Sequence, residues 1–212
     1  MQLTIREPGS AITHFIGCLM ALIAASPLLI KAHGNATYML AMTIFATSMV
    51  LLYAASTIYH SICHVSAKVL RNFQKLDHMM IFVLIAGSYT PVCMIILGGR
   101  IGYTLLALVW GIAVAGIIIK GLWITCPKWF SSIIYIAMGW VCVFVFRELI
   151  HTLSVPAFCW LLAGGIIYTV GGIIYALKLP IFNAKHANFG SHEIFHLFVM
   201  AGSICHFIFM YR

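Results

Sequence analysis

The sequence predicts an all-α protein, a bundle of seven transmembrane helices formed by one domain that covers residues 1–212. Hydrophobic residues make up 63% of the chain and charged residues 8%, against about 25% charged residues in soluble domains. Apolar runs of about 20 residues, the length that a helix needs to cross a bilayer, recur seven times. A chain so poor in charge has too few polar residues to cover a water-facing surface, which excludes a soluble protein.

The seven apolar runs follow one another with short gaps. We expect membrane spans at 11–31, 38–62, 78–98, 102–120, 130–147, 156–177 and 191–211. The gaps KAHGNA, HVSAKVLRNFQK, GGR, TCPK and KLPIFNAKHANFG carry charges and helix-breaking residues. The fifth span has the weakest boundaries, because Arg147 and Glu148 interrupt it.

Small residues and prolines predict how the spans pack. Gly164-Gly165 and Gly171-Gly172 lie seven residues apart in the sixth span, so they recur on one face and let a neighbouring helix approach closely. Pro27 and Pro91 predict kinks in the first and third spans, which a membrane bundle tolerates.

The distribution of basic residues predicts the orientation. With the N-terminus in the cytoplasm, that side carries eight cations: Arg6, Lys68, Arg71, Lys75, Lys120, Lys128, Lys178 and Lys185. The other side carries four: Lys31, Arg100, Arg147 and Arg212. Because cytoplasmic loops are enriched in Lys and Arg, we expect a cytoplasmic N-terminus and an external C-terminus. These cations are interpreted as topology determinants and contacts to anionic lipid, and no basic run indicates a nucleic-acid partner.

Ionisable residues from three distant segments are expected in one layer of the membrane. His60 lies near the cytoplasmic end of the second span, Asp77 lies at the start of the third, and His192 and His196 open the seventh. Ionisable residues inside a membrane are costly and indicate a functional site.

The histidine spacing predicts a metal site. His192 and His196 are four residues apart, so they share one helix face and can bind one ion. His60 is the favoured third ligand, and three imidazoles leave the fourth position of a tetrahedral Zn²⁺ open for water. Asp77 is then expected to orient or deprotonate that water. Ser56, one turn before His60, is expected to hydrogen-bond a substrate carbonyl or the water.

Two other histidines are alternative candidates for the third ligand. His64 is four residues after His60, in the basic gap, and His78 follows Asp77 directly. Either could take the place of His60.

The string SHEIFH (191–196) also contains an HExxH match, which in soluble proteins is typical of zinc peptidases. The longer HExxHxxGxxH pattern fails, because Val199 stands at the glycine position and Gly202 at the histidine position. His206 is about 15 Å beyond His196 along a helix. A peptidase is therefore the less favoured interpretation, and Glu193 is not expected to act as its base.

Several motifs resemble those of a known family. They are STIYH (56–60), KLDH (75–78), AGSYTP (86–91), AMGW (137–140), and HxxxH followed by GSICHF (202–207), with REP and THFIG near the start. In order and spacing the chain resembles the haemolysin III family from about Glu7 to His206. This family is the bacterial branch of the progestin and adipoQ receptor group, which includes the adiponectin receptors.

The resemblance implies seven helices, a cytoplasmic N-terminus and a zinc ion near the cytoplasmic side of a bacterial cytoplasmic membrane. Carried over by motif, the ligands are His60, His192 and His196, with Asp77 near the zinc-bound water and Ser56 in the same pocket. The group is also similar to alkaline ceramidases, which suggests zinc-dependent hydrolysis of lipid amides or esters.

Three functions are weighed on this basis. The first is a zinc hydrolase whose partners are the bilayer and a lipid substrate. The second is a membrane-lipid homeostasis sensor with structural zinc, and the third is a pore-forming cytolysin, as the family name suggests. A retinal pump is excluded because the seventh span has no lysine for a Schiff base. Assembly into a homo-oligomer stays open.

Overall fold

The computed structural model describes residues 5–177 and 190–212, and these residues form helices and no strands. The elements are α1 (Pro8–Ala32), α2 (Ala36–Ser61), α3 (Ala67–Pro91), a π-helical turn (Val92–Leu97), α4 (Gly99–Leu122), α5 (Lys128–Gly139), a 3₁₀ turn (Val141–Val145), α6 (Phe146–Thr152), α7 (Val155–Leu177) and α9 (Ser191–Tyr211). Within these two ranges, seven helical spans are long and apolar enough to cross a membrane. The predicted fold class is confirmed. Two cations of the orientation argument, Lys178 and Lys185, lie outside the described residues.

Side-chain caps explain where two of the helices begin. Asn35 accepts a hydrogen bond from the Tyr38 N–H at 3.1 Å before α2. Ser66 accepts one from the Val69 N–H at 3.3 Å before α3. Such caps satisfy N–H groups that have no partner within the first helical turn.

The third span begins earlier than predicted. The sequence interpretation placed the basic stretch before residue 78 in a gap, but α3 begins at Ala67. Lys and Arg are good helix formers and Ser66 caps the first turn, so the basic stretch is helical. Asp77 therefore lies inside α3 rather than at its start. At Pro91, which lacks an N–H, the helix passes into the π-helical turn Val92–Leu97.

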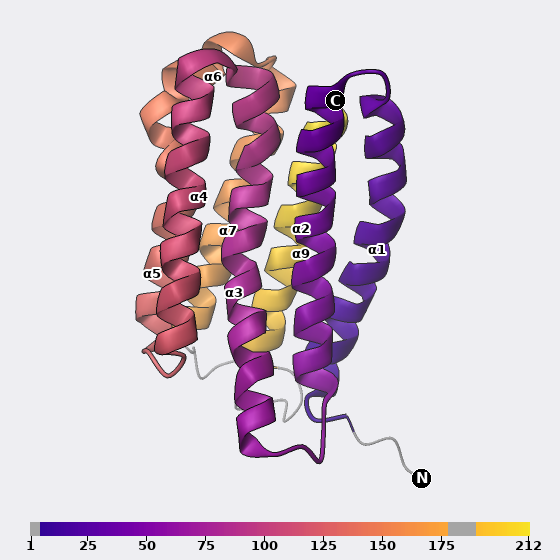
Figure 1. The fold of residues 1–212 in the computed structure, drawn as a ribbon, viewed down its shortest axis with the longest axis vertical. Coiled ribbons are helices and arrows are strands. Elements are labelled where there is room, and N and C mark those ends of the chain that lie inside the picture. The colour runs from indigo at the N-terminus through magenta and orange to yellow at the C-terminus, as the bar shows by residue number, and fades with distance from the viewer. Residues whose placement is uncertain (1–4, 178–189) are drawn as a thin grey trace.

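The fifth span is longer than predicted and consists of three pieces. It runs from Lys128 to Thr152 through α5, the 3₁₀ turn and α6. Arg147 and Glu148 do not end the span, because both lie within α6. Figure 1 shows α6 at the end of the bundle where the C-terminus lies.

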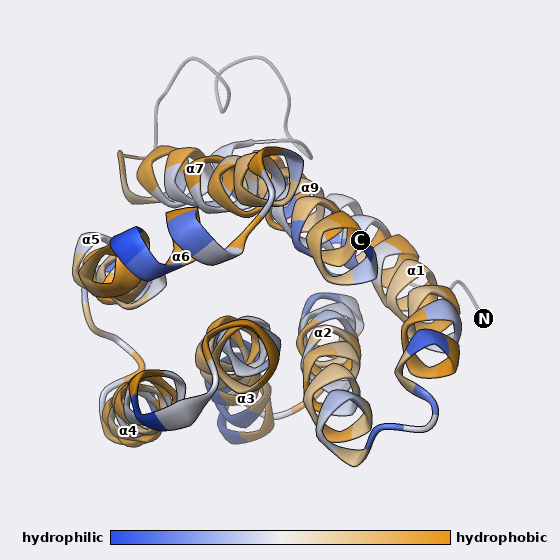
Figure 2. Ribbon diagram, turned by 90° about the horizontal axis from the view of Figure 1, so that it is seen from above, coloured by the Kyte–Doolittle hydropathy of each residue, from blue (hydrophilic) through white to orange (hydrophobic). Residues whose placement is uncertain are grey.

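The helices form a closed ring. Viewed along the bundle in Figure 2, the order around the ring is α1, α2, α3, α4, α5, α7 and α9, and neighbouring helices in this order contact one another. Large apolar side chains such as Ile23 and Leu122 are exposed on the helices, as expected of surfaces that face lipid. α1 begins and α9 ends at opposite ends of the bundle (Figure 1). Which end faces the cytoplasm stays a prediction from the basic residues.

Glycines bring α7 and α9 together, as predicted. A Cβ on Gly164 would lie 2.8 Å from His206 Nε2, and one on Gly171 would lie 2.6 Å from Phe198 Cβ. Both distances are too short for a side chain, so α9 packs directly on this face of α7. The predicted close approach is thus found at Gly164 and Gly171, whereas nothing lies within 4 Å of a Cβ on Gly165 and a Cβ on Gly172 would face Ile136 of α5.

Candidate metal centre

Three histidine rings meet where α2 ends and α9 begins. His60 Nε2 lies 3.3 Å from His192 Nε2, and the ring centroids of His192 and His196 are 4.5 Å apart. One nitrogen from each ring lies within 4.8 Å of the other two. Tetrahedral bonds of about 2.0–2.1 Å to zinc would separate ligand nitrogens by about 3.3 Å. The donor set and its spacing therefore fit a divalent ion of the kind that imidazoles bind, such as Zn²⁺.

The second nitrogen of His60 is held by a carboxylate that the sequence interpretation did not include in the site. His60 Nδ1 is hydrogen-bonded to Glu7 Oε2, and the Glu7 N–H donates to the His60 carbonyl at 3.0 Å. The hydrogen bond from His60, with smaller contributions from the charges of His60 and Arg6, lowers the pKa of Glu7 against the opposing effect of burial. Metal-bound histidines often have such a carboxylate partner, which orients the ring. The sequence could have pointed to Glu7 as a site residue, because it is one of only four acids and directly precedes the first span.

His196 is held from the side of α1. Its Nδ1 lies 3.4 Å from Thr13 Oγ1, so Nε2 is the nitrogen left to bind an ion. The ring of His14 stacks on it, with centroids 3.6 Å apart and planes 11° apart. His14 is buried, and neither of its ring nitrogens has a hydrogen-bond partner among the described residues. The sequence analysis did not predict His14 as a site residue and included it only within the motif THFIG.

Asp77 and Ser56 lie beside the histidine cluster. Both are buried and line the same cavity as His192 and His196. Asp77 is not among the three residues whose ligand atoms converge. The Ser56 hydroxyl lies next to Asp77 but forms no hydrogen bond of ordinary geometry. The structure thus brings together all five residues that the sequence placed in the site.

The two alternative third ligands lie outside the cluster. His64 follows the end of α2 with a positive φ of 57°, and it lines a separate surface hollow with Arg6 and Cys63. His78 lines the main cavity, but its ring is not part of the converging set. Of the three histidines weighed in the sequence, the one that meets His192 and His196 is His60.

Glu193, the acid of the HExxH match, has a structural position. Its Oε2 accepts a hydrogen bond from the Gly190 N–H at 2.7 Å, and its Oε1 accepts one from Ser10 Oγ at 2.7 Å. It therefore caps the start of α9 and ties α9 to α1. It does not line the cavity, and this position does not suit the general base of a peptidase.

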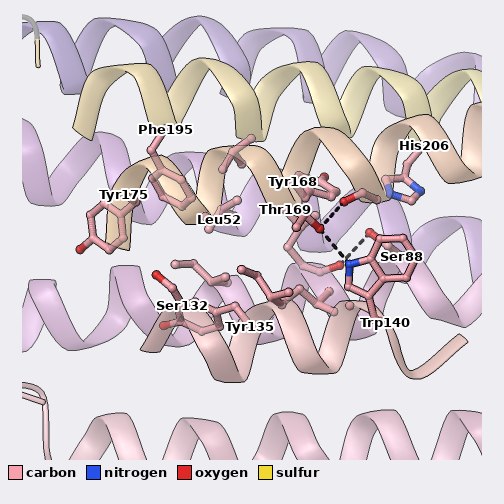
Figure 3. A pocket seen from close by; sticks show the side chains of 18 of the residues that line it. Leu52, Ser88, Ser132, Tyr135, Trp140, Tyr168, Thr169, Tyr175, Phe195 and His206 are labelled. Carbon is pink, nitrogen blue, oxygen red and sulfur yellow. Dashed lines mark hydrogen bonds between the residues drawn. The ribbon is translucent and has the colours of Figure 1, made fainter. Parts of the chain in front are cut away.

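A long cavity opens from the cluster into the bundle. Apolar side chains form most of its wall. Ser132, Tyr135 and Tyr175 lie towards one end in Figure 3, and Trp140, Thr169 and His206 lie towards the other. Because His192 and His206 both line the cavity and are 14 residues apart on α9, it extends about 21 Å along that helix.

Lys120, one of the cations used to predict the orientation, is buried rather than exposed. Lys120 was expected at the membrane surface, but it is 3% exposed and lines the cavity. Its position near the end of α4 gave no sign of this, because burial depends on how α4 is rotated against α5.

Comparisons with known proteins show the family of the chain. The family model "Haemolysin-III related" matches residues 3–207. The chain is 43% identical to "Hemolysin-3" of Bacillus cereus over 205 residues, which cover 95% of this chain and 89% of that protein. The chain belongs to the haemolysin III family.

Two further relatives extend the comparison. This haemolysin III protein is 40% identical to "Hemolysin-3 homolog" of Bacillus subtilis (strain 168) over 207 residues, 96% of this chain and 92% of the relative. It is 29% identical to "Progestin and adipoQ receptor-like protein 1" of Caenorhabditis elegans over 226 residues, 95% of this chain and 50% of the relative. It is a multi-pass membrane protein related to those receptors.

Proposed function

We propose that this haemolysin III protein is a membrane-embedded zinc hydrolase of lipid amides or esters. The observation that carries the proposal is the convergence of three imidazoles at one end of a long apolar cavity, which the buried carboxylate of Asp77 also lines. Apolar cavities with a few polar groups at one point are typical of ligand and active sites. We further propose that the protein lies in a bacterial cytoplasmic membrane with its N-terminus inside.

The histidines are proposed to hold the ion, and the residues around them to hold the histidines. His60, His192 and His196 supply the ligand nitrogens. Glu7 fixes the ring of His60, and Thr13 and the stacked ring of His14 fix His196. A bound Zn²⁺ would polarise the substrate carbonyl and acidify a water molecule.

Asp77 and Ser56 are proposed to act on the water and the substrate. Asp77 takes the proton from the attacking water. Among the described residues that line the cavity, it is the one with a carboxylate. The Ser56 hydroxyl, which has no ordinary hydrogen bond, is available to donate to the carbonyl oxygen. The apolar wall holds the acyl chain and keeps bulk water from the reacting bond.

The test uses two variants and two measurements. We expect purified His196→Ala to lose both zinc, measured by mass spectrometry of the metal, and hydrolysis of an N-hexadecanoyl sphingoid base or of 4-nitrophenyl hexadecanoate. We expect Asp77→Asn to keep zinc and to lose about 10²- to 10⁴-fold in rate, the usual contribution of a general base. Normal turnover by zinc-loaded Asp77→Asn would show that this mechanism is wrong.

The printed names of the Bacillus relatives favour a second candidate, a pore-forming cytolysin. A pore needs a polar path, whereas this cavity is walled mostly by apolar side chains such as Leu84 and Val199. Dye leakage from liposomes tests this candidate. If His196→Ala causes as much leakage as the unchanged protein, the pore is favoured. A homeostasis sensor with structural zinc would instead retain zinc and show no turnover of either substrate.

A further inference from the structure

A buried lysine lines the cavity at the end where the histidines lie. Lys120 is in the last turn of α4 and is 3% exposed. Its Nζ donates to Ser131 Oγ at 2.5 Å and to Cys126 Sγ at 3.1 Å. Because an ammonium group has three N–H donors, one donor is left without a partner among the described residues.

No carboxylate of the described chain neutralises this lysine. The protein has four acids, Glu7, Asp77, Glu148 and Glu193. The ion pairs between described residues within 4 Å are those of Glu7 with Arg6 and His60. The carbonyl end of α4 carries a partial negative charge that favours a nearby cation. Buried cations are nevertheless normally paired with a full anion, since an isolated charge in an apolar surrounding is strongly disfavoured.

Other polar groups surround the same end of the cavity. The Lys128 ammonium lies 4.5 Å from the centre of the Tyr175 ring. Lys120, Lys128 and His192 all lie within electrostatic range of His78. Ser132, which is 3% exposed, also lines the cavity, and Figure 3 shows it towards the same end as Tyr175. Two lysines and the Ser132 hydroxyl therefore lie at the end of the cavity where His192 lies.

We propose that Lys120 and Ser132 form an anion subsite that holds the carboxylate or phosphate of an amphiphile whose chain lies in the apolar cavity. The oxyanion supplies the negative charge that would neutralise Lys120, and it accepts a hydrogen bond from the remaining N–H of the ammonium group. Charge-assisted hydrogen bonds of this kind are stronger than neutral ones. The inference deepens the proposed function by assigning it anionic lipids as substrates. It rests on that function for the reacting bond, but binding itself requires no reaction.

Direct binding tests the subsite. Tritiated hexadecanoate, hexadecyl phosphate and hexadecanol, which share one chain length, are titrated onto protein purified in a neutral maltoside detergent. We expect Lys120→Met to bind the anions about 10- to 100-fold more weakly, the loss of one hydrogen bond to a charged group, and to bind hexadecanol unchanged. Lys120→Arg keeps the charge and should retain most of the anion preference. Lys68→Met removes an equal but exposed charge from α3 and is the matched control.

The pattern across ligands identifies the source of the anion. Weakening of hexadecanoate alone indicates a fatty-acid carboxylate, and weakening of hexadecyl phosphate alone indicates a lipid phosphate; either outcome supports the subsite. Equal affinity of Lys120→Met and the unchanged protein for both anions would overturn it, as would an equal loss for hexadecanol. If Lys120→Met does not fold, Ser132→Ala carries the test with the same three ligands.

The same titration in His196→Ala separates this inference from the proposed hydrolase. An anion preference that persists without the histidine, and is lost on adding Lys120→Met, supports the subsite even if no hydrolysis is found. The opposite result is that the unchanged protein hydrolyses the substrates but binds the anions and the alcohol equally well. This result would support the hydrolase and contradict the subsite.

Discussion

At the scale of single residues, the contact between Glu7 and His60 decides how one candidate ligand is held. The carboxylate bonds the Nδ1 of His60, so that Nε2 faces His192. The backbone of Glu7 also bonds the end of α2, which keeps the carboxylate in place. A ligand whose ring is fixed in this way loses less freedom when it binds an ion.

Replacing the Glu7 carboxylate should therefore weaken metal binding without abolishing it. We expect Glu7→Gln to lower zinc affinity about 10- to 100-fold, the usual effect of removing a partner of a metal-bound histidine. Competition with a fluorescent zinc chelator measures it. Glu148→Gln, in α6 at the opposite end of the bundle, should leave the affinity unchanged. Equal affinity of Glu7→Gln and the unchanged protein would contradict the assigned role of Glu7.

At the scale of elements, close contact between α7 and α9 sets the position of two candidate ligands. α9 carries His192 and His196, and it lies against the glycine face of α7. Its start is fixed by Glu193, which bonds both Gly190 and Ser10 of α1. A shift of α9 away from α7 would displace both histidines at once.

A methyl group on the glycine face should loosen this contact. We expect Gly171→Ala to destabilise the protein by about 1–3 kcal/mol, because its Cβ would overlap Phe198 and force the helices apart. Gly111→Ala on α4 is the matched control, since nothing lies within 4 Å of the Cβ it would add. Thermal unfolding in detergent, followed by circular dichroism, compares the two. A Gly171→Ala protein as stable as Gly111→Ala would show that α9 does not pack as tightly as described.

At the scale of the whole molecule, the histidine cluster links helices from opposite ends of the chain. His60 belongs to α2 and the other two histidines to α9, while α1 lies between these helices in the ring. An ion bound by all three would join the first and last parts of the bundle across its interior. A ligand that binds the folded state alone raises stability with its concentration.

Zinc should therefore stabilise the bundle. At a free zinc concentration 100 times the Kd, we expect a gain of about 2.7 kcal/mol, seen as a higher melting temperature in detergent. A chelator should reverse the gain in the unchanged protein and have no effect on His196→Ala. Equal melting temperatures of the unchanged protein with zinc and with chelator would argue against an ion that joins α2 and α9.

The errors of the sequence interpretation have two causes. The start of α3 was placed too late and Arg147 and Glu148 were read as the end of a span, because hydropathy detects membrane-compatible runs rather than helices. Polar helical turns extend beyond the apolar window when a cap such as Ser66 is present. Lys120 was assigned to the surface because its distance from the end of the span says nothing about which way it faces.

By itself the sequence determined the seven spans, since hydropathy and length are local properties of each segment, and the helical spacing of His192 and His196. It also singled out His60, Asp77 and Ser56 through their depth in the spans and through motif resemblance. The tertiary structure alone decided that Glu7 holds His60, that His14 stacks on His196, and that Lys120 faces a cavity with no carboxylate partner among the described residues. The physical reason is that these contacts depend on the order of the helices in the ring and on the rotation of each about its axis. Packing between distant segments sets both, and no local pattern encodes them.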